Sequence, residues 1–149
     1  MTIDPDLQGR SYPAGDTYSV GREAIRDFAR AVQATHPAHF DVDAAVALGH
    51  ADLVAPPTFA IIVAQRADAR LISDPSAGIN FTRVVHADQR FIHHRPIIAG
   101  DQLVAELHVD SVRAMGGGAM ITTRAEISTV DGVPTATSTS SILVRGEDQ

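Results

Sequence analysis

The sequence predicts an α+β domain in which antiparallel strands pack against a mostly buried helix. Two observations support this prediction. Helical patterns occupy the first half of the chain, and strand patterns separated by turn signals occupy the second half. The helix predicted near the middle of the chain begins with a segment that is apolar on all sides, which indicates that other structure encloses it.

The first two predicted helices lie in the N-terminal third of the chain. The first begins after Gly21 and ends at Pro37. Its apolar stripe has helical spacing and consists of Ile25, Phe28, Ala29 and Val32. A short second helix is predicted over residues 44–48, with Asp41 or Asp43 as its cap and Gly49 as its stop.

The third helix is predicted from Thr58 to about Ile72, with Pro56-Pro57 in its first turn. Residues 59–64 are apolar all round, so this half should be enclosed. The second half should emerge toward solvent because it carries charged side chains, namely Arg66, Asp68 and Arg70.

The strands of the second half are predicted from extended and alternating patterns. Residues 82–94 form a long extended stretch, and residues 102–110 and 119–127 alternate between apolar and polar side chains. Gly116-Gly117-Gly118 and Asp131-Gly132 mark hairpins. A last strand covers residues 133–144, where Pro134 indicates a strand start or an edge. The Thr/Ser series from 135 to 141 is interpreted as hydroxyls on the wet face of this strand.

Composition places the chain among ordinary globular proteins. It has 149 residues, of which 44% are hydrophobic and 20% charged, so it can bury a core without staples. We expect one domain over residues 1–149, with residues 1–17 as an irregular lead-in. The absence of cysteine excludes disulfides, a thiolate nucleophile and cysteine-ligated metals.

Net charge and hydropathy limit which classes of partner and which cellular compartment we expect for this protein. The formal net charge of −6 argues against a nucleic-acid partner, which requires a basic surface. The most apolar stretch, residues 59–64, is far shorter than the roughly 20 residues of a membrane span. Asp4 and Asp6 stand where a secretory signal would need an apolar core, so we expect a cytoplasmic protein.

Three local features occur in a telling order. These are the loop His36-Pro37-Ala38-His39, the proline-started helix, and a strand that ends in the run from Arg95 to Asp101. In this order, the chain resembles the MaoC-like hot-dog family, in particular subunits of (3R)-hydroxyacyl-thioester (acyl carrier protein) dehydratases. The resemblance runs from Tyr18 to Val144 and includes Gly21-Arg22-Glu23, the run from Leu53 to Phe59, and Asp88-Gln89-Arg90-Phe91. It implies a hot-dog fold, in which an antiparallel sheet wraps around a central buried helix.

The resemblance also bears on catalysis. Active members of the family carry an Asp-x-Asn-Pro-x-His loop, whose Asp and His hold the water that is added to, or removed from, an enoyl thioester. Here Pro37 and His39 match this loop, His36 replaces the Asn, and Ala34 stands at the Asp position. Alanine can neither exchange a proton nor hold a water. The resemblance therefore implies a hydro-lyase subunit of fatty-acid metabolism that binds the acyl chain and lacks a complete dyad.

Site residues and partners follow from the same resemblance. His39 is the candidate catalytic residue, and the candidate substrate-binding residues are His36, Pro57 and Thr58. No cofactor is expected, with coenzyme A or acyl carrier protein serving as the thioester handle of the substrate. The partner is either a second copy of the chain or a hot-dog subunit that bears Asp and His, because pairing would cover an open sheet edge.

Several alternatives stay open. The chain can be a self-sufficient enoyl-CoA hydratase that uses His39 with Asp41 or Asp43, a non-catalytic acyl-CoA-binding regulatory protein, or, on fold analogy alone, a thioesterase. His39 can equally be an ordinary loop histidine bonded to backbone, and Thr58 can be a helix cap.

Two further patterns are given structural interpretations. His86 and His94 share a strand face but lie about 27 Å apart, and His93 points to the other face, so no metal site is expected. Arg22, Arg26 and Arg30 form a basic stripe that could receive an acidic carrier protein or the phosphates of coenzyme A. Pairing of Arg26 and Arg30 with Glu23 and Asp27 on a solvated helix face is the favoured interpretation.

Overall fold

The computed structural model describes residues 3–146. Over these residues the helices are α1 (Arg22–Ala31), α2 (Val42–Ala47) and α3 (Ala60–Ile72). The strands are β1 (Ser11–Tyr12), β2 (Tyr18–Ser19), β3 (Val84–His93), β4 (Gln102–Met115), β5 (Gly118–Thr129) and β6 (Pro134–Val144). Short 3-10 turns η1 to η5 cover Pro5–Leu7, Pro37–His39, Pro57–Phe59, Pro75–Ala77 and Phe81–Arg83.

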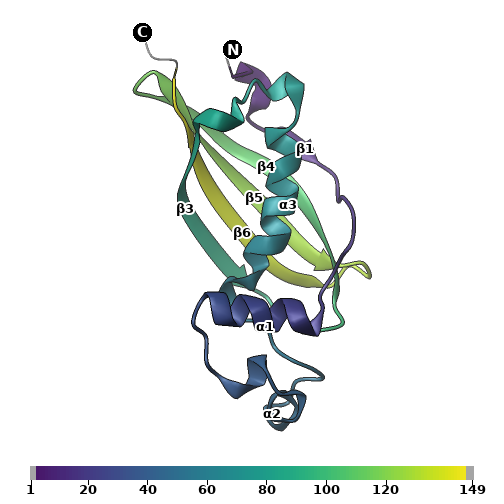
Figure 1. Ribbon diagram of the computed structural model, residues 1–149. Helices are drawn as coiled ribbons and strands as arrows, with labels where there is room; N and C mark the ends of the chain where they lie inside the picture. Colours follow the sequence, from purple (N-terminus) through teal and green to yellow (C-terminus); the bar gives the residue numbers. More distant parts are fainter. Residues whose placement is uncertain (1–2, 147–149) are drawn as a thin grey trace.

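All six strands of the described residues belong to one antiparallel sheet. The strand order is β1-β4-β5-β6-β3, and β2 pairs with β4 as well. Helix α3 lies across one face of this sheet, and α1 and α2 lie beyond the N-terminal end of α3 (Figure 1). The α+β class and the hot-dog arrangement of sheet and central helix are thus confirmed.

The core lies between α3 and the sheet. Alternate residues of β4 and β5 point into it and are fully or almost fully buried, as the sequence pattern predicts. The helix contributes mostly small side chains, namely Ala60, Val63, Ala64, Ala67 and Leu71. Small residues let the helix axis approach the sheet closely. Larger side chains, including Leu103, Leu107 and Ile121, fill the sheet side of the core.

Helix α3 ends at Ile72 as predicted, but its start and the exposure of several side chains differ from the prediction. The helix starts with a 3-10 turn, so that regular α-helix begins only at Ala60. Ile61 and Ile62 are only partly buried, although both were expected to be enclosed. The reason is that the sheet covers one side of α3 and leaves its flanks open. Asp68, expected to emerge toward solvent, instead turns toward the sheet and is bonded to β5.

Helix α1 also ends earlier than expected. It stops at Ala31, and Gln33 adopts a left-handed backbone conformation with φ 59°. Val32, assigned to the apolar stripe, is 45% exposed because it lies at the C-cap, outside the helical repeat. Helix α2 begins at Val42, two residues earlier than predicted, with Asp41 as its cap.

The prediction for Pro134 is confirmed, whereas the predictions for the β6 hydroxyls and for the start of β3 need correction. Pro134 is the first residue of β6, which confirms a strand start, but β6 is not an edge because it pairs with both β5 and β3. The hydroxyl series of β6 does not lie on a wet face alone, since Thr135, Ser138 and Ser140 are buried. The alternation of the strand places Ser138 and Ser140 on the core face, together with Ala136 and Ile142. β3, in turn, begins at Val84 rather than 82, after a 3-10 turn.

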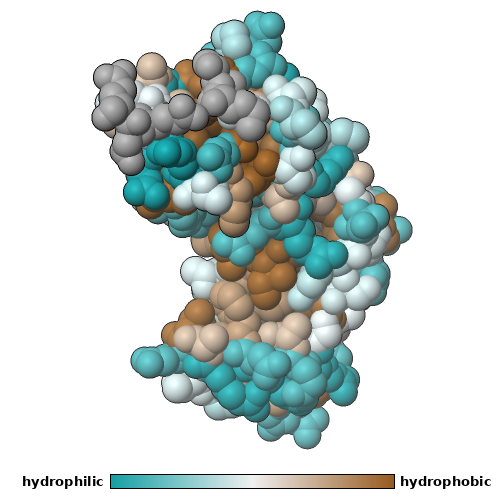
Figure 2. Space-filling model, turned by 45° about the horizontal axis from the view of Figure 1, so that its top comes forward, coloured by the Kyte–Doolittle hydropathy of each residue, from teal (hydrophilic) through white to brown (hydrophobic). Residues whose placement is uncertain are grey.

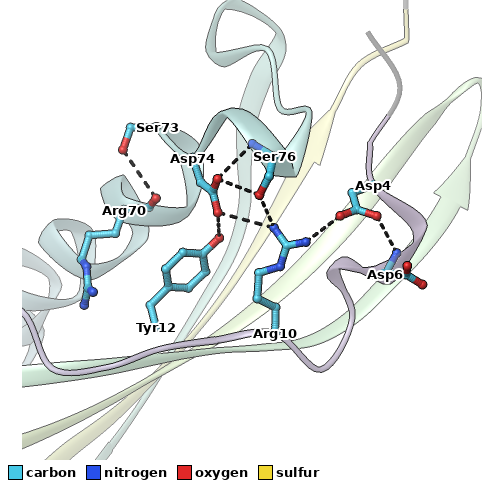
Figure 3. A network of polar contacts seen from close by, with 8 residues as sticks. All are labelled: Asp4, Asp6, Arg10, Tyr12, Arg70, Ser73, Asp74 and Ser76. Atoms are coloured by element: carbon cyan, nitrogen blue, oxygen red, sulfur yellow. Dashed lines mark hydrogen bonds and ion pairs between the residues drawn. The ribbon is translucent and has the colours of Figure 1, made fainter.

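The lead-in is more regular than predicted over residues 3–17, while residues 1 and 2 lie outside the described part. A polar network ties it to the end of α3 (Figure 3). Tyr12 donates to Asp74 at 2.6 Å, and Arg10 contacts Asp4 at 2.5 Å and Ser76 at 2.9 Å. The Tyr12 hydrogen bond is the main reason that the pKa of Asp74 is lowered.

No helix within the described residues is long and apolar enough to cross a membrane.

Candidate functional site

The histidine loop is bonded to the segment that leads into the central helix. The N–H of Val54 donates to the carbonyl of Ala38 at 3.1 Å, and Nδ1 of His39 lies 2.6 Å from the carbonyl oxygen of Val54. Val54 also forms a bridge to Ile98, just beyond the turn that follows β3. Three segments that are distant in sequence therefore meet beside the start of α3.

The contact of His39 with Val54 determines where the ring proton lies. A carbonyl oxygen only accepts hydrogen bonds, so Nδ1 of His39 must be the donor. In the neutral ring, Nε2 then carries the free lone pair. The side chain is partly buried, and this tautomer leaves Nε2 able to accept a proton, as a general base must. Sequence reasoning left open a backbone-bonded histidine, and the structure shows that this bond and a free Nε2 are compatible.

The side chains of His36 and Asp41 accept hydrogen bonds from backbone N–H groups two residues further along the chain. Nδ1 of His36 accepts from the N–H of Ala38 at 3.1 Å, which caps the 3-10 turn, and the side chain is exposed. Asp41 accepts from the N–H of Asp43 at 3.0 Å and caps α2. Asp41 and Asp43 are both exposed.

Ala34 lies just after the left-handed residue that ends α1. Its N–H donates to the carbonyl of Ala29 at 2.8 Å, so its backbone is held against the end of that helix. Its side chain is a methyl group, and His39 consequently has no carboxyl on this position of the loop.

Pro57 and Thr58 belong to the 3-10 turn that starts the central helix, and both are exposed. The cap interpretation of Thr58 is wrong, because neither the 3-10 turn nor α3 has a side-chain cap hydrogen bond. Beside them lies a cavity of about 360 Å³. Its walls come from the helix start and the end of β3, and they include Pro56, Pro57, His93, His94 and Pro96.

A larger cavity of about 660 Å³ runs along α3, between the helix and the β3 side of the sheet. Its volume lies within the roughly 300–1,000 Å³ typical of small-molecule sites. Most of its lining is apolar, with Ile61, Leu71, Ile72, Phe81, Val84 and Ile142 among the residues. Figure 2 shows apolar surface in a hollow on this side of the molecule, between the polar α1–α2 end and the opposite end.

Sequence reasoning missed the polar residues of this cavity. Asp68 lies in its wall and accepts a hydrogen bond from the hydroxyl of Thr123 at 2.8 Å. Burial raises the pKa of the Asp68 carboxyl, although the Thr123 hydrogen bond and the His86 charge act in the opposite direction. The available signal was a charged residue on a mostly apolar helix together with hydroxyls at alternate positions of one strand.

Two of the remaining histidines and the arginine stripe of α1 bond to neighbouring side chains in the described residues. No group of three or more His, Cys, Asp or Glu residues there is suited to hold a metal ion. Nε2 of His86 bonds to Gln89 at 3.0 Å, and Nε2 of His94 bonds to Thr137 at 3.0 Å. The basic stripe of α1 is paired as favoured, by Arg26 with Glu23, by Arg30 with Asp27, and by Arg22 with Asp52.

Comparison with known families identifies the chain's relatives. Residues 6–138 match the family model described as FAS1-like, dehydratase domain region. The chain belongs to this family. Among curated proteins, a UPF0336 protein of Leifsonia xyli subsp. xyli is 50% identical to this chain over 148 residues, which cover 99% of each chain.

Solved structures place the family among MaoC-like hot-dog dehydratases. A chain of the HadBC (3R-hydroxyacyl-ACP dehydratase) complex from Mycobacterium tuberculosis is 37% identical, with a TM-score of 0.82 over 93% of this chain and 97% of that chain. A MaoC-like dehydratase is 31% identical, with a TM-score of 0.86 over 96% of this chain and 43% of that chain. The family and the hot-dog fold implied by the motifs are therefore confirmed.

Proposed function

We propose that this chain is the acyl-chain-binding subunit of a (3R)-hydroxyacyl-thioester dehydratase, and that it acts with a hot-dog partner that supplies the Asp/His dyad. The observation that carries the proposal is the pairing of an incomplete loop with a well-formed apolar cavity. The ring of His39 is held by the carbonyl of Val54, but Ala34 stands where the loop needs a carboxyl. The cavity along α3, by contrast, has room for a long apolar chain.

The reaction explains why the loop is insufficient. Dehydration removes a proton from C2 of the 3-hydroxyacyl thioester and expels the C3 hydroxyl as water once an acid protonates it. Hydration runs the same steps backward. A lone imidazole must take the C2 proton and protonate the leaving hydroxyl in turn, with no carboxyl on the loop to hold the water. The neighbouring carboxyls do not fill this gap, because Asp41 caps α2 and Asp43 lies exposed in the first turn of that helix.

Assembly with a partner fits both the comparisons and the sheet. The similar chain of known structure comes from a complex named as a (3R)-hydroxyacyl-ACP dehydratase. In this chain β3 is an edge strand that pairs with β6 on one side, and the large cavity opens beside it. An unpaired edge next to an apolar cavity is a surface that a second hot-dog subunit can cover. The thioester handle is coenzyme A or acyl carrier protein, and the site of action is the cytoplasm.

One observation favours a second candidate, a self-sufficient enoyl-CoA hydratase. The bond from His39 to Val54 leaves Nε2 available as a base. In this version His39 does the proton transfer alone, and a homodimer would be active.

The test measures hydration of a trans-2-enoyl-CoA series by the purified chain, by a candidate partner that carries the Asp-x-Asn-Pro-x-His loop, and by their mixture. We expect no turnover by the chain alone and turnover on long chains by the mixture, with a 1:1 complex in light scattering. Replacement of the partner's Asp should abolish the rate. Turnover by the chain alone that is lost in His39→Ala, but kept in the matched control His50→Ala, would establish the second candidate instead.

A further inference from the structure

A row of polar side chains crosses the sheet beneath α3, within a mostly apolar core. Thr123 of β5 pairs in register with Ser140 of β6, and Ser140 pairs with Gln89 of β3. Thr123 and Ser140 are only 3% and 4% exposed. On the same face of β6, Ile142 lies on one side of Ser140. On the other side lies Ser138, which is also buried and accepts a hydrogen bond from the side-chain amide of Gln89 at 2.5 Å. Ser140 and Gln89 line the cavity, so the row ends in the cavity wall.

A β-bulge adds a further polar group to this row. The register of β3 against β6 shifts between His86 and Asp88, which makes Ala87 the extra residue. In a regular strand, His86 and Gln89 would point to opposite faces of the sheet. The bulge brings both onto the cavity, where Nε2 of His86 lies 3.0 Å from Oε1 of Gln89. Bulges commonly re-aim side chains in this way beside functional sites.

Asp68 completes the arrangement from the helix side. Its Oδ1 accepts from Thr123 at 2.8 Å, and the side chain lies in the wall of the cavity. Polar side chains from α3, β3 and β6 therefore converge in the wall of the cavity, and Thr123 of β5 bonds to Asp68 from the core behind it. The amide of Gln89 is bonded at both ends, to His86 and to Ser138. The second carboxyl oxygen of Asp68 and the hydroxyl of Ser140, by contrast, have hydrogen-bonding capacity left for a ligand. A purely hydrocarbon ligand would strip water from these two groups and offer no hydrogen bond in return, which is unfavourable.

We propose that this polar row is a binding subsite for an oxygen atom, a hydroxyl or keto group, carried part-way along the acyl chain that fills the cavity. The inference rests on the proposed function, because it takes the cavity to be the acyl site. The row is defined as Asp68, His86, Gln89, Thr123 and Ser140. It makes the subunit selective for acyl chains with an oxygen at one depth.

The depth of the row separates this oxygen from the reacting hydroxyl. Asp68 lies about three helical turns, or about 16 Å, beyond Pro57 at the start of the central helix. A thioester held at the helix start keeps its C3 hydroxyl near that end. The group that reaches the row is therefore farther down the chain.

The experiment measures binding of stearoyl-CoA and of hydroxystearoyl-CoA isomers, in which the hydroxyl is moved along the chain, to the purified subunit by calorimetry. We expect one or two mid-chain isomers to bind about tenfold more tightly than stearoyl-CoA, the size of one hydrogen bond to a buried polar group. Asp68→Leu should equalise the affinities. Gln89→Leu, on a separate strand, should also weaken the preference for the mid-chain hydroxyl. The two variants are independent, so the proposal can still be tested if one of them fails to fold.

A matched control and two distinct failures complete the design. Glu126→Gln changes a carboxyl on the opposite face of β5, where Glu126 pairs with Arg124, and should keep the preference. Equal affinity of all isomers for the unaltered protein would overturn the subsite and leave the proposed function intact. Absence of binding by every acyl-CoA, alone and with the partner, would overturn the acyl site itself.

Discussion

Replacement of Phe59 by alanine should destabilise the fold strongly. Phe59 is the last residue of the 3-10 turn before α3, and its side chain is 0% exposed. Its ring packs edge-on against Phe28 at 5.4 Å between centroids and lies 6.3 Å from the ring of Tyr18. It thus joins the central helix to α1 and to β2.

The magnitude follows from burial. Truncation of a fully buried Phe to Ala costs about 3–5 kcal/mol in free energy of unfolding, since it loses transfer energy and leaves a cavity. The aromatic contacts make up about 0.5–1.5 kcal/mol of such a loss. With a urea dependence of about 2 kcal/mol per M, the unfolding midpoint should fall by about 1.5–2.5 M.

The matched control is Phe81→Ala. Phe81 is 70% exposed, so the same change of side chain should alter stability by no more than about 0.5 kcal/mol. Urea unfolding of both variants is followed by circular dichroism at two protein concentrations, because subunit association would add concentration-dependent stability. A loss below about 1 kcal/mol for Phe59→Ala, or equal losses for both variants at the lower concentration, would refute the reasoning from burial.

Two more predictions concern the cavity and the sheet. Burial raises the folded-state pKa of Asp68 above the usual value of about 3.9, so the folded protein holds this proton more tightly than the unfolded chain does. The stability of the protein should therefore fall as the pH rises from about 4 toward the raised folded-state pKa. Asp68→Asn should therefore gain stability relative to the unaltered protein at pH 7 and lose this advantage near pH 4, as urea midpoints across pH would show; a constant difference would contradict the shift. Gly118→Ala should lower the thermal midpoint, since its Cβ would lie 2.1 Å from the carbonyl oxygen of Val144, whereas Gly15→Ala, which meets only the flexible side chain of Arg70, should not.

The elements with a clear local pattern could be predicted from the sequence. The alternation of β4 and β5, the hairpins at Gly116-Gly117 and Asp131-Gly132, and the cap of α2 depend on contacts between near neighbours in the chain. Periodicity and turn chemistry report such contacts directly. The order of motifs around Pro37 and His39 likewise indicated the family, which the comparisons confirm.

Other features depend on which segments meet, and only the tertiary structure decided them. The proton position on His39 depends on Val54, and the burial of Asp68 depends on Thr123. Neither partner is within helical or strand spacing of the residue that it controls. The serines of β6 illustrate the same limit, since a run of hydroxyls reads as polar from the sequence whichever face they occupy. Composition and periodicity therefore determined the class of fold, and the resemblance to the family motif located the loop. The packing of α3 against the sheet decided which polar groups line the cavity, because burial depends on contacts between residues far apart in the chain.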